Sequence, residues 1–184
     1  MLVLLFIFII IFQRLIEVII AKRNERKILL AGGYEVGASH YAYMIALHVS
    51  FFISLLVEVL LIDREISPWF LWFFLIFILA QALRIWCLVS LGSFWNTKIM
   101  ILPGANVVKK GPYLFIKHPN YFVVCIEILL LPLMFQAYFT AVTFTILNFV
   151  MLSVRIPIEE KALIDATNYQ DKFNKNAQTT TRID

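Results

Sequence analysis

The stretch Gly111-Pro112-Tyr113-Leu114-Phe115-Ile116-Lys117-His118-Pro119-Asn120-Tyr121 lies between two long apolar segments. It gathers two prolines, a glycine, two tyrosines, a lysine and a histidine in a chain that is otherwise mostly hydrocarbon. Residues 122–133 then run apolar except for Glu127. The sequence therefore places a cluster of hydrogen-bonding, titratable side chains at the mouth of a membrane helix.

Two interpretations of this stretch follow from its position. Polar residues at membrane depth cost free energy unless they are paired or face a cavity, so they mark functional sites by default. Alternatively the stretch is an interfacial anchor, because tyrosine, lysine and histidine favour the headgroup region and Pro119 suits the first position of a helix. The rest of the chain favours the functional interpretation.

The composition is that of an integral membrane protein. The 184 residues are 61% hydrophobic, with 17 phenylalanines and a mean hydropathy of +0.85, whereas soluble domains are about 45–50% apolar. A bilayer core about 30 Å thick needs about 20 apolar residues per helix. Five candidate spans meet or approach this length: 1–21, 43–62, 69–91, 121–136 and 137–156. The sequence predicts an all-α, polytopic membrane protein whose residues 1–184 form one domain.

Basic residues predict the orientation, because lysine and arginine are retained on the cytoplasmic side. They follow the first, third and fifth spans: Lys22, Arg23, Arg26 and Lys27; Lys98, Lys109, Lys110 and Lys117; Lys161, Lys172, Lys175 and Arg182. The other connections carry only Arg64, beside Asp63 and Glu65, or no charge. We therefore expect the N-terminus outside and the C-terminus and the 111–121 stretch in the cytoplasm. Anionic lipid explains the net charge of +4 without nucleic acid.

Several common catalytic patterns are missing from the sequence. It contains no H-E-x-x-H, no G-x-S-x-G and no G-x-G, so neither a zinc protease site, nor a hydrolase elbow, nor a dinucleotide-binding turn is expected. Cys87 and Cys125 lie in separate spans without a C-x-x-C pattern, which predicts neither a disulfide nor a metal site. The first span lacks a basic leader and a cleavage site, so we expect it to remain attached.

The first three spans contain polar residues for which contact with lipid would be costly: Arg14, Glu17, Glu58, Gln81 and Arg84. Arg14 and Glu17 are three residues apart, as are Gln81 and Arg84, so each pair shares one helical face. Arg14, Glu17 and Glu58 are interpreted as contacts that stabilise the bundle. Arg84 also lies about two turns before the cytoplasmic end of its span.

The connection over residues 92–111 predicts a functional loop. Prolines and glycines interrupt it too often for a long helix, and it is too apolar and aromatic to be disordered. A connection of this length without clear secondary structure is unusual in a compact protein and is often functional.

The last two spans predict a tight antiparallel hairpin. We expect Pro157 to bend or restart the final helix, with Glu159 and Glu160 in a new first turn where the helix dipole favours acids. The bland interpretation is a membrane-exit motif with capping acids. The hairpin nevertheless returns Arg155 and Glu159 to the face that carries His118, so polar residues distant in sequence converge.

The sequence resembles the isoprenylcysteine carboxyl methyltransferase-like family of integral membrane methyltransferases. The resemblance covers roughly residues 83–173 and rests on four motifs: Leu83-Arg84 followed by Gly92-x-x-Trp95-Asn96; Gly111-Pro112-Tyr113-x-x-x-Lys117-His118-Pro119-Asn120-Tyr121; Arg155-x-x-x-Glu159-Glu160-x-x-Leu163; and Tyr169-x-x-x-Phe173. Lys117 stands where the family usually has arginine. The chain is also shorter than the eukaryotic enzymes, as in compact bacterial members of the plasma membrane.

The resemblance implies an S-adenosylmethionine pocket at the cytoplasmic face. Cofactor contacts then fall on Ala105, Asn106, Val107, Val108, Tyr113, His118, Pro119, Asn120, Tyr121 and Glu159. The catalytic residues are Arg155 and Glu159: Arg155 holds an anionic substrate through its planar fork, and Glu159 offsets the positive charge of the cofactor. The reaction is O-methylation of an acidic oxygen in a water-poor site, where charge is lost on the way to the transition state.

The substrate is expected to be lipophilic and to arrive from the membrane. An S-prenylated cysteine carboxylate and a long-chain acidic enol such as an alkylpyrone both fit, and the compact size favours the second, because small members of the family resemble enzymes associated with type III polyketide synthases. Two other functional classes stay open: an NADPH-dependent membrane reductase of the sterol type, and a non-catalytic membrane scaffold.

Overall fold

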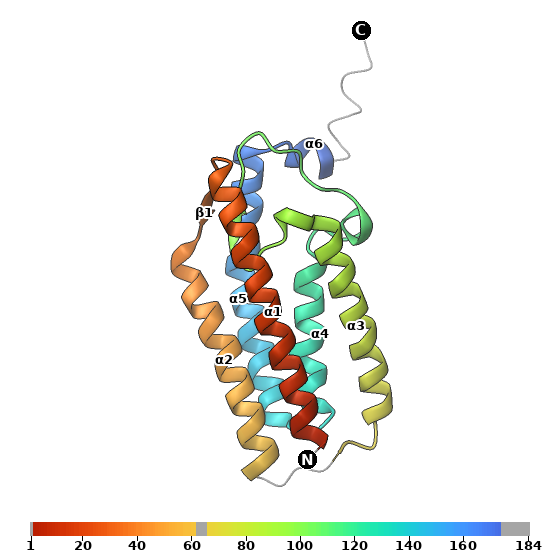
Figure 1. Ribbon diagram of the computed structural model, residues 1–184. Coiled ribbons are helices and arrows are strands. Elements are labelled where there is room, and N and C mark those ends of the chain that lie inside the picture. The colour runs from red at the N-terminus through yellow and green to blue at the C-terminus, as the bar shows by residue number, and fades with distance from the viewer. Residues whose placement is uncertain (1, 62–65, 174–184) are drawn as a thin grey trace.

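The computed structural model describes residues 2–61 and 66–173. Five helices run roughly side by side along one long axis (Figure 1). They are α1 (Leu2–Leu30), α2 (Ala38–Leu61), α3 (Phe70–Leu91), α4 (Pro119–Leu133) and α5 (Tyr138–Ala166). Shorter elements gather at the end of the bundle opposite to the start of α1: β1 (Tyr34–Val36), η1 (Gly92–Phe94), β2 (Ile99–Ile101), η2 (Gly111–Leu114) and α6 (Tyr169–Phe173).

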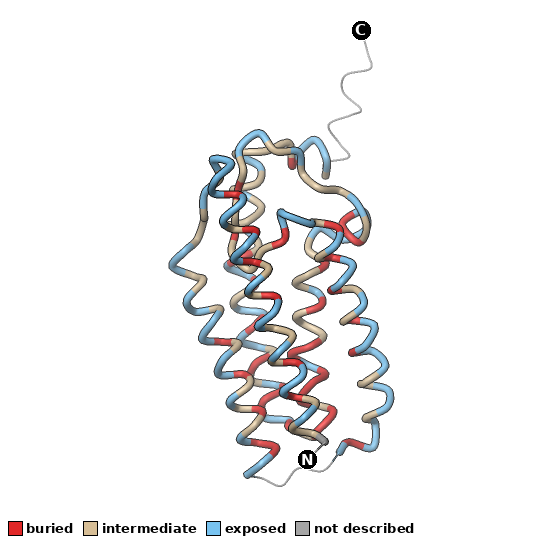
Figure 2. Tube along the Cα trace, viewed as in Figure 1, coloured by how far each residue is buried: buried red, intermediate tan, exposed pale blue. Residues whose placement is uncertain are grey.

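The outward faces of the helices are apolar, which confirms an integral membrane protein. Large side chains such as Phe12 and Leu79 are 64% and 70% exposed, and exposed positions follow the outer surface of the bundle in Figure 2. Four helices, α1, α2, α3 and α5, are long and apolar enough to cross a bilayer. The prediction of five spans holds for these four. The remaining helix, α4, has 15 residues, or about 22 Å against a core of about 30 Å.

Pro157 does not interrupt the last long helix, so the prediction of a bend or restart there was wrong. The helix α5 is continuous through it, and Glu159 and Glu160 lie inside the helix and not in a first turn. Proline removes only one backbone donor. Arg155 on one side and Glu159 and Glu160 on the other make side-chain contacts that hold the helix in place.

The all-α prediction is confirmed for the membrane bundle, and a short two-stranded ribbon lies at its α6 end. Strand β1 pairs antiparallel with β2, with Tyr34 opposite Ile101. Beside it, Lys98 Nζ lies 2.8 Å from both Glu25 Oε1 of α1 and Glu35 Oε2 of β1. These two acceptors raise the pKa of Lys98. The ribbon and this ion pair attach the loop after α3 to the first hairpin.

The bundle end that carries the N-terminal part of α1 is closely packed. Ile7, Leu55 and Met134 are fully buried there. Phenylalanine rings meet edge to face, with centroids 5.6 Å apart between Phe51 of α2 and Phe144 of α5. Glu58 of α2 accepts hydrogen bonds from the backbone N–H groups of Phe139 and Thr140, which otherwise have no partner at a helix N-terminus. Glu58 therefore stabilises the bundle, as predicted.

A buried ion network joins α1, α3 and α4. Arg14 donates to Glu17 at 2.5 Å and to Glu127 at 2.7 Å, and Arg84 donates to Glu17 at 3.1 Å and to both carboxylate oxygens of Glu127. Gln13 and Gln81 add further hydrogen bonds. We call Arg14, Glu17, Arg84 and Glu127 the ion network. It confirms the interpretation of Arg14 and Glu17 as bundle contacts and adds Arg84 to them.

The orientation in the membrane stays a prediction. The charged residues 63–65 and the basic residues Lys175 and Arg182 lie outside the described residues. The other basic residues after the first, third and fifth spans lie toward the bundle end that carries α6 (Figure 1). This is the distribution expected if that end is cytoplasmic.

Candidate functional site

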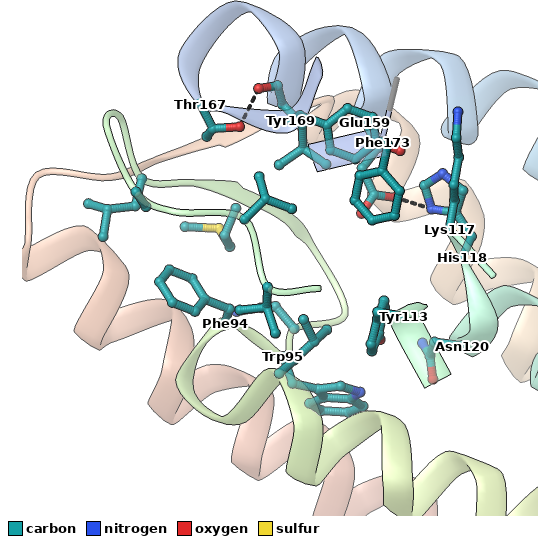
Figure 3. Close-up of a pocket in the computed structure, with 18 of the residues that line it drawn as sticks. Phe94, Trp95, Tyr113, Lys117, His118, Asn120, Glu159, Thr167, Tyr169 and Phe173 are labelled. Carbon is teal, nitrogen blue, oxygen red and sulfur yellow. Dashed lines mark hydrogen bonds and ion pairs between the residues drawn. The ribbon is translucent and has the colours of Figure 1, made fainter. Parts of the chain in front are cut away.

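A polar cavity lies at the α6 end of the bundle, and we call it the upper cavity (Figure 3). Its walls come from the end of α3, the 92–111 loop, the start of α4, the last turns of α5 and α6. The predicted site residues that line it are Ala105, Asn106, Val107, Val108, Tyr113, His118, Asn120, Tyr121, Arg155 and Glu159. The structure thus brings together residues from three distant parts of the sequence. Pro119 is not in the lining, because it is buried as the first residue of α4.

Gly111 allows the central stretch to approach α3 closely. Its backbone has φ +58°, and a Cβ atom there would lie 2.2 Å from Ser90 Oγ. A side chain therefore fits neither the left-handed conformation nor the space. The following turn, η2, buries Tyr113 against α3, and burial raises the pKa of the Tyr113 phenol. A tyrosine is protonated at neutral pH in any case, and burial makes ionisation of Tyr113 harder still.

Arg155 is 5% exposed and is held from two sides. Its Nε donates to the Tyr121 hydroxyl at 2.8 Å, and its Nη2 donates to the Thr97 carbonyl at 2.6 Å. Within the described residues, its Nη1 has no hydrogen-bond partner. Arg155 is thus fixed in position with one donor nitrogen uncommitted.

Tyr121 links Arg155 to Glu159. The Tyr121 hydroxyl accepts from Arg155 Nε and donates to Glu159 Oε2. The imidazole of His118 stacks on the Tyr121 ring, with centroids 5.4 Å apart and planes inclined by 20°. Arg155, Tyr121 and Glu159 therefore form a connected chain of hydrogen bonds along one wall of the upper cavity.

The two adjacent glutamates have different partners. Glu159 lines the cavity, and its Oε2 lies 3.9 Å from His118 Nδ1. Glu160 Oε1 lies 3.1 Å from His118 Nε2 and accepts a hydrogen bond from the Tyr169 hydroxyl at 3.2 Å. Burial, together with the Glu160 charge, raises the pKa of Tyr169. Glu160 thus fixes His118 and α6 in place, whereas Glu159 is presented to the cavity.

The loop over residues 102–110 closes the upper cavity. Asn168 accepts a hydrogen bond from the backbone N–H of Val107 and donates to Asn106, both at 2.8 Å. Gly104 N–H donates to the Ala166 carbonyl at 2.9 Å. In Figure 3 the rings of Tyr169 and Phe173 project from the α6 side toward Tyr113 and Trp95 on the opposite side. These hydrogen bonds therefore link the 102–110 loop to the segment that leads into α6, beside the upper cavity.

A second, mostly apolar cavity lies within the bundle, and we call it the lower cavity. Its volume is about 840 Å³, against about 160 Å³ for the upper cavity. Residues of α1, α2, α4 and α5 line it, among them Met44, Phe52 and Met151. Three of these helices, α1, α2 and α5, are long and apolar enough to cross a bilayer, so the lower cavity lies among candidate membrane spans.

Six residues line both cavities, and we call them the junction: Trp95, Asn96, Lys98, Asn120, Tyr121 and Arg155. Two polar atoms of the junction are buried without a hydrogen-bond partner within the described residues, Trp95 Nε1 and Asn120 Oδ1. Trp95 is only 2% exposed. Buried polar groups are normally paired. One donor and one acceptor are therefore available to a ligand where the two cavities meet.

Sequence analysis missed part of this site. Trp95 and Asn96 belong to a quoted motif but were not assigned to the site, and the same holds for Tyr169 and Phe173. Asn168, which holds the loop, was not singled out at all. Its only signal was its position directly before Tyr169.

The fold and the site define an integral membrane protein with an upper cavity of mixed polar and apolar lining and a mostly apolar cavity between its helices, which share the six residues of the junction. Residues 71–165 match the family model described as "Isoprenylcysteine carboxyl methyltransferase (ICMT) family". The chain belongs to this family of membrane methyltransferases, whose members generally use S-adenosylmethionine. The match confirms the resemblance found in the sequence.

Two bacterial relatives are similar over most of their length. A protein of Bacillus subtilis (strain 168) named "Uncharacterized protein YpbQ" is 51% identical over 159 residues, which cover 86% of this chain and 95% of the relative. An "Uncharacterized protein" of Haemophilus influenzae (strain ATCC 51907 / DSM 11121 / KW20 / Rd) is 28% identical over 145 residues, covering 78% of this chain and 84% of the relative. No solved structure matches the chain.

Proposed function

We propose that this protein is an S-adenosylmethionine-dependent O-methyltransferase that acts on an acidic oxygen of a lipophilic substrate at the cytoplasmic face of the membrane. The observation that carries the proposal is the junction. A polar cavity and an apolar membrane cavity meet at a buried arginine that has one uncommitted donor nitrogen. Membership of a methyltransferase family supplies the reaction class.

The residues of the upper cavity fit S-adenosylmethionine in their chemistry. Bound there, the cofactor supplies an electrophilic methyl group on a positively charged sulfur. Glu159 faces the cavity and offers the opposite charge, and the unpaired Asn120 Oδ1 offers an acceptor. Tyr113, Tyr169 and Phe173 offer rings to the adenosine part. The upper cavity measures about 160 Å³, below the roughly 300 Å³ at which ligand pockets usually begin, so the proposal includes an outward movement of the 102–110 loop when the cofactor binds.

Arg155 orients the acidic group of the substrate. A guanidinium is always protonated and can hold an anionic oxygen without removing its charge. The Tyr121 hydroxyl and the Thr97 carbonyl bind Nε and Nη2 of Arg155, so its uncommitted Nη1 is held in a fixed position. No strong base is needed, because a carboxylate or an acidic enol is already ionised at neutral pH. Positioning in a site with little water is what the chain contributes.

The lower cavity supports a lipophilic substrate. It is about 840 Å³ in volume and is lined mainly by apolar side chains of membrane helices. A hydrocarbon tail placed there leaves the acidic head at Arg155. An alkylpyrone and an isoprenylcysteine both meet this requirement, and the compact chain makes the alkylpyrone our first choice.

Isothermal titration of the detergent-purified protein tests the cofactor. We expect S-adenosylmethionine to bind and NADPH not to bind. His118→Ala and Tyr121→Phe should each weaken S-adenosylmethionine binding about tenfold, which corresponds to one hydrogen bond or ring contact. His40→Ala is the matched control, because His40 lines neither cavity. NADPH binding would favour a reductase, and binding of neither compound would favour a scaffold.

A further inference from the structure

Polar residues recur in the wall of the lower cavity at a fixed depth below the junction level. On each of four helices, a residue at that level is followed six or seven positions deeper by a polar residue that lines the cavity. The pairs are Ala21 and Arg14 in α1, Tyr41 and His48 in α2, Tyr121 and Glu127 in α4, and Arg155 and Asn148 in α5. At 1.5 Å per residue, these separations are roughly 9–10 Å.

The level of each upper residue follows from its contacts. The Ala21 carbonyl accepts a hydrogen bond from Asn96 of the junction at 3.2 Å. The Tyr41 hydroxyl lies 3.1 Å from Thr97 Oγ1, in the same loop. We call Arg14, His48, Glu127 and Asn148 the polar belt. Its members come from α1, α2, α4 and α5, which supply most of the lining of the lower cavity, so they lie at a similar depth around it.

Bundle stability explains only part of the polar belt. The Glu127 carboxylate accepts hydrogen bonds from Arg14, Gln81 and Arg84, so it is fully engaged. These bonds tie α1, α3 and α4 together. They leave the α2 side of the belt unexplained, because His48 takes no part in the ion network.

His48 presents a free acceptor to the lower cavity. Its Nδ1 lies 2.8 Å from the Met44 carbonyl oxygen. A carbonyl only accepts, so Nδ1 carries the proton and Nε2 of the neutral ring has a lone pair. Within residues 2–61 and 66–173, neither His48 Nε2 nor Arg14 Nε has a hydrogen-bond partner. The belt therefore offers an acceptor and a donor that bundle packing does not use.

We propose that the polar belt binds a second hydrogen-bonding group of the substrate, a hydroxyl, roughly 9–10 Å from the oxygen that is methylated. A hydroxyl both donates and accepts, so its chemistry matches the His48 Nε2 acceptor as well as the Arg14 Nε donor. The inference rests on the proposed function, in which the substrate tail occupies the lower cavity. It deepens that function, because it predicts that a plain hydrocarbon tail is not the preferred substrate.

The test compares three lipids that share one acidic head. The heads are 4-hydroxy-2-pyrones with a 6-alkyl chain of equal length: one plain, one hydroxylated in mid-chain at the depth of the polar belt, and one hydroxylated at the chain end. Binding to the full-length protein in nanodiscs is followed by tryptophan fluorescence, and methyl transfer is measured separately. We expect the mid-chain hydroxyl to improve binding about tenfold or more over both other lipids.

Variants assign the preference to the belt. His48→Phe keeps a ring but removes the acceptor, so it should reduce the preference for the mid-chain hydroxyl to near one. His48→Gln keeps an acceptor and should retain part of it. Phe52→Leu, in the apolar wall of the same cavity, is the matched control and should keep the preference.

The outcomes separate the two proposals. Equal binding of the three lipids by the wild-type protein overturns the inference, and so does a full preference in His48→Phe. A preference in binding without any S-adenosylmethionine binding or methyl transfer overturns the proposed function and leaves the belt as a lipid-recognition site. Methyl transfer to all three lipids at equal efficiency supports the proposed function and overturns the inference about the polar belt.

Discussion

The two ends of the bundle are built from the same helices, but one is closely packed and the other encloses cavities. Around Leu55, Phe77 and Met134 the interior is filled, and the side chains there are almost wholly buried. Toward α6 the same helices enclose two cavities, and the polar atoms Trp95 Nε1 and Asn120 Oδ1 are left unpaired. The packed end holds the helices in register, so the open end can keep space for ligands. Close packing and ligand-sized space are therefore separated along the bundle axis.

The ion network lies between these two regions. It is internally neutral, with two arginines and two glutamates, and it fastens α1 to α3 and α4. Its four residues line the lower cavity, which extends past them to Ile10 on α1 and Leu131 on α4. The network therefore links three helices within the wall of that cavity.

The largest effect is expected at Arg155, in the open end. Arg155→Ala should reduce methyl transfer at least a hundredfold, because the acidic group loses its only described cation at the junction apart from Lys98, which is engaged by Glu25 and Glu35. Arg155→Lys keeps a charge but loses the planar fork, so turnover should fall while S-adenosylmethionine affinity stays near wild type.

Titration calorimetry and a radiolabelled methyl-transfer assay measure the two effects of Arg155. Loss of cofactor binding in Arg155→Lys, with the thermal transition unchanged, would move Arg155 from the substrate to the cofactor. A fully active Arg155→Ala variant would contradict the proposed role of Arg155 in binding the acidic group of the substrate.

The next largest effect is expected in the ion network. Glu127→Gln leaves the buried Arg84 and Arg14 with one carboxylate between them, and breaking a buried pair costs about 3–5 kcal/mol. Thermal unfolding in detergent should show a marked loss of stability. Glu25→Gln is the control: Glu25 pairs with Lys98 in a partly exposed position, where an ion pair contributes about 0–1 kcal/mol. Equal losses in the two variants would show that the network has no special structural role.

Much of the fold follows from the sequence, because the bilayer imposes the length and polarity of each span. Residues 43–62 and 69–91 predict α2 and α3 to within a few residues at each end. Helix ends were harder to predict, since α1 continues beyond the apolar run to Leu30, where basic residues remain compatible with a helix in water. Pro157 was misjudged because single-residue propensity says nothing of the contacts that hold a helix together on both sides of a proline.

The site was predictable where it rests on compact motifs and unpredictable where it rests on tertiary contacts. Tyr121 and Arg155 were assigned from their motifs, and in the structure Arg155 Nε lies 2.8 Å from the Tyr121 hydroxyl. Two contacts of the site join segments far apart in sequence: Arg155 with the Thr97 carbonyl, and Asn168 with the 102–110 loop. The residue types alone do not predict either contact. The lower cavity is a space between helices, which no linear pattern encodes.

A pair of matched truncations compares the packed and the open end directly. Leu55→Ala removes a fully buried side chain from the packed end and should cost about 2–5 kcal/mol, because the surrounding core closes only in part. Met44→Ala removes a side chain from the wall of the lower cavity and should cost about 1 kcal/mol or less, since the space beside it is already open. Thermal unfolding of both variants measures the difference. Similar losses would mean that the lower cavity is filled in the membrane-bound protein.

The smallest effect separates two neighbouring carboxylates, of which only one faces the upper cavity. Glu159→Gln removes the negative charge presented to the cofactor, and it should weaken S-adenosylmethionine binding about tenfold, or roughly 1.4 kcal/mol. Glu160→Gln keeps an acceptor for His118 and Tyr169, so its effect should stay within about threefold. Calorimetry at matched salt concentration resolves these factors, because both glutamates lie on the same turn of α5 and feel the same ionic screening. A stronger effect of Glu160→Gln would reverse the roles assigned to the two residues, and it would make His118, which Glu160 holds, the main contact of the cofactor.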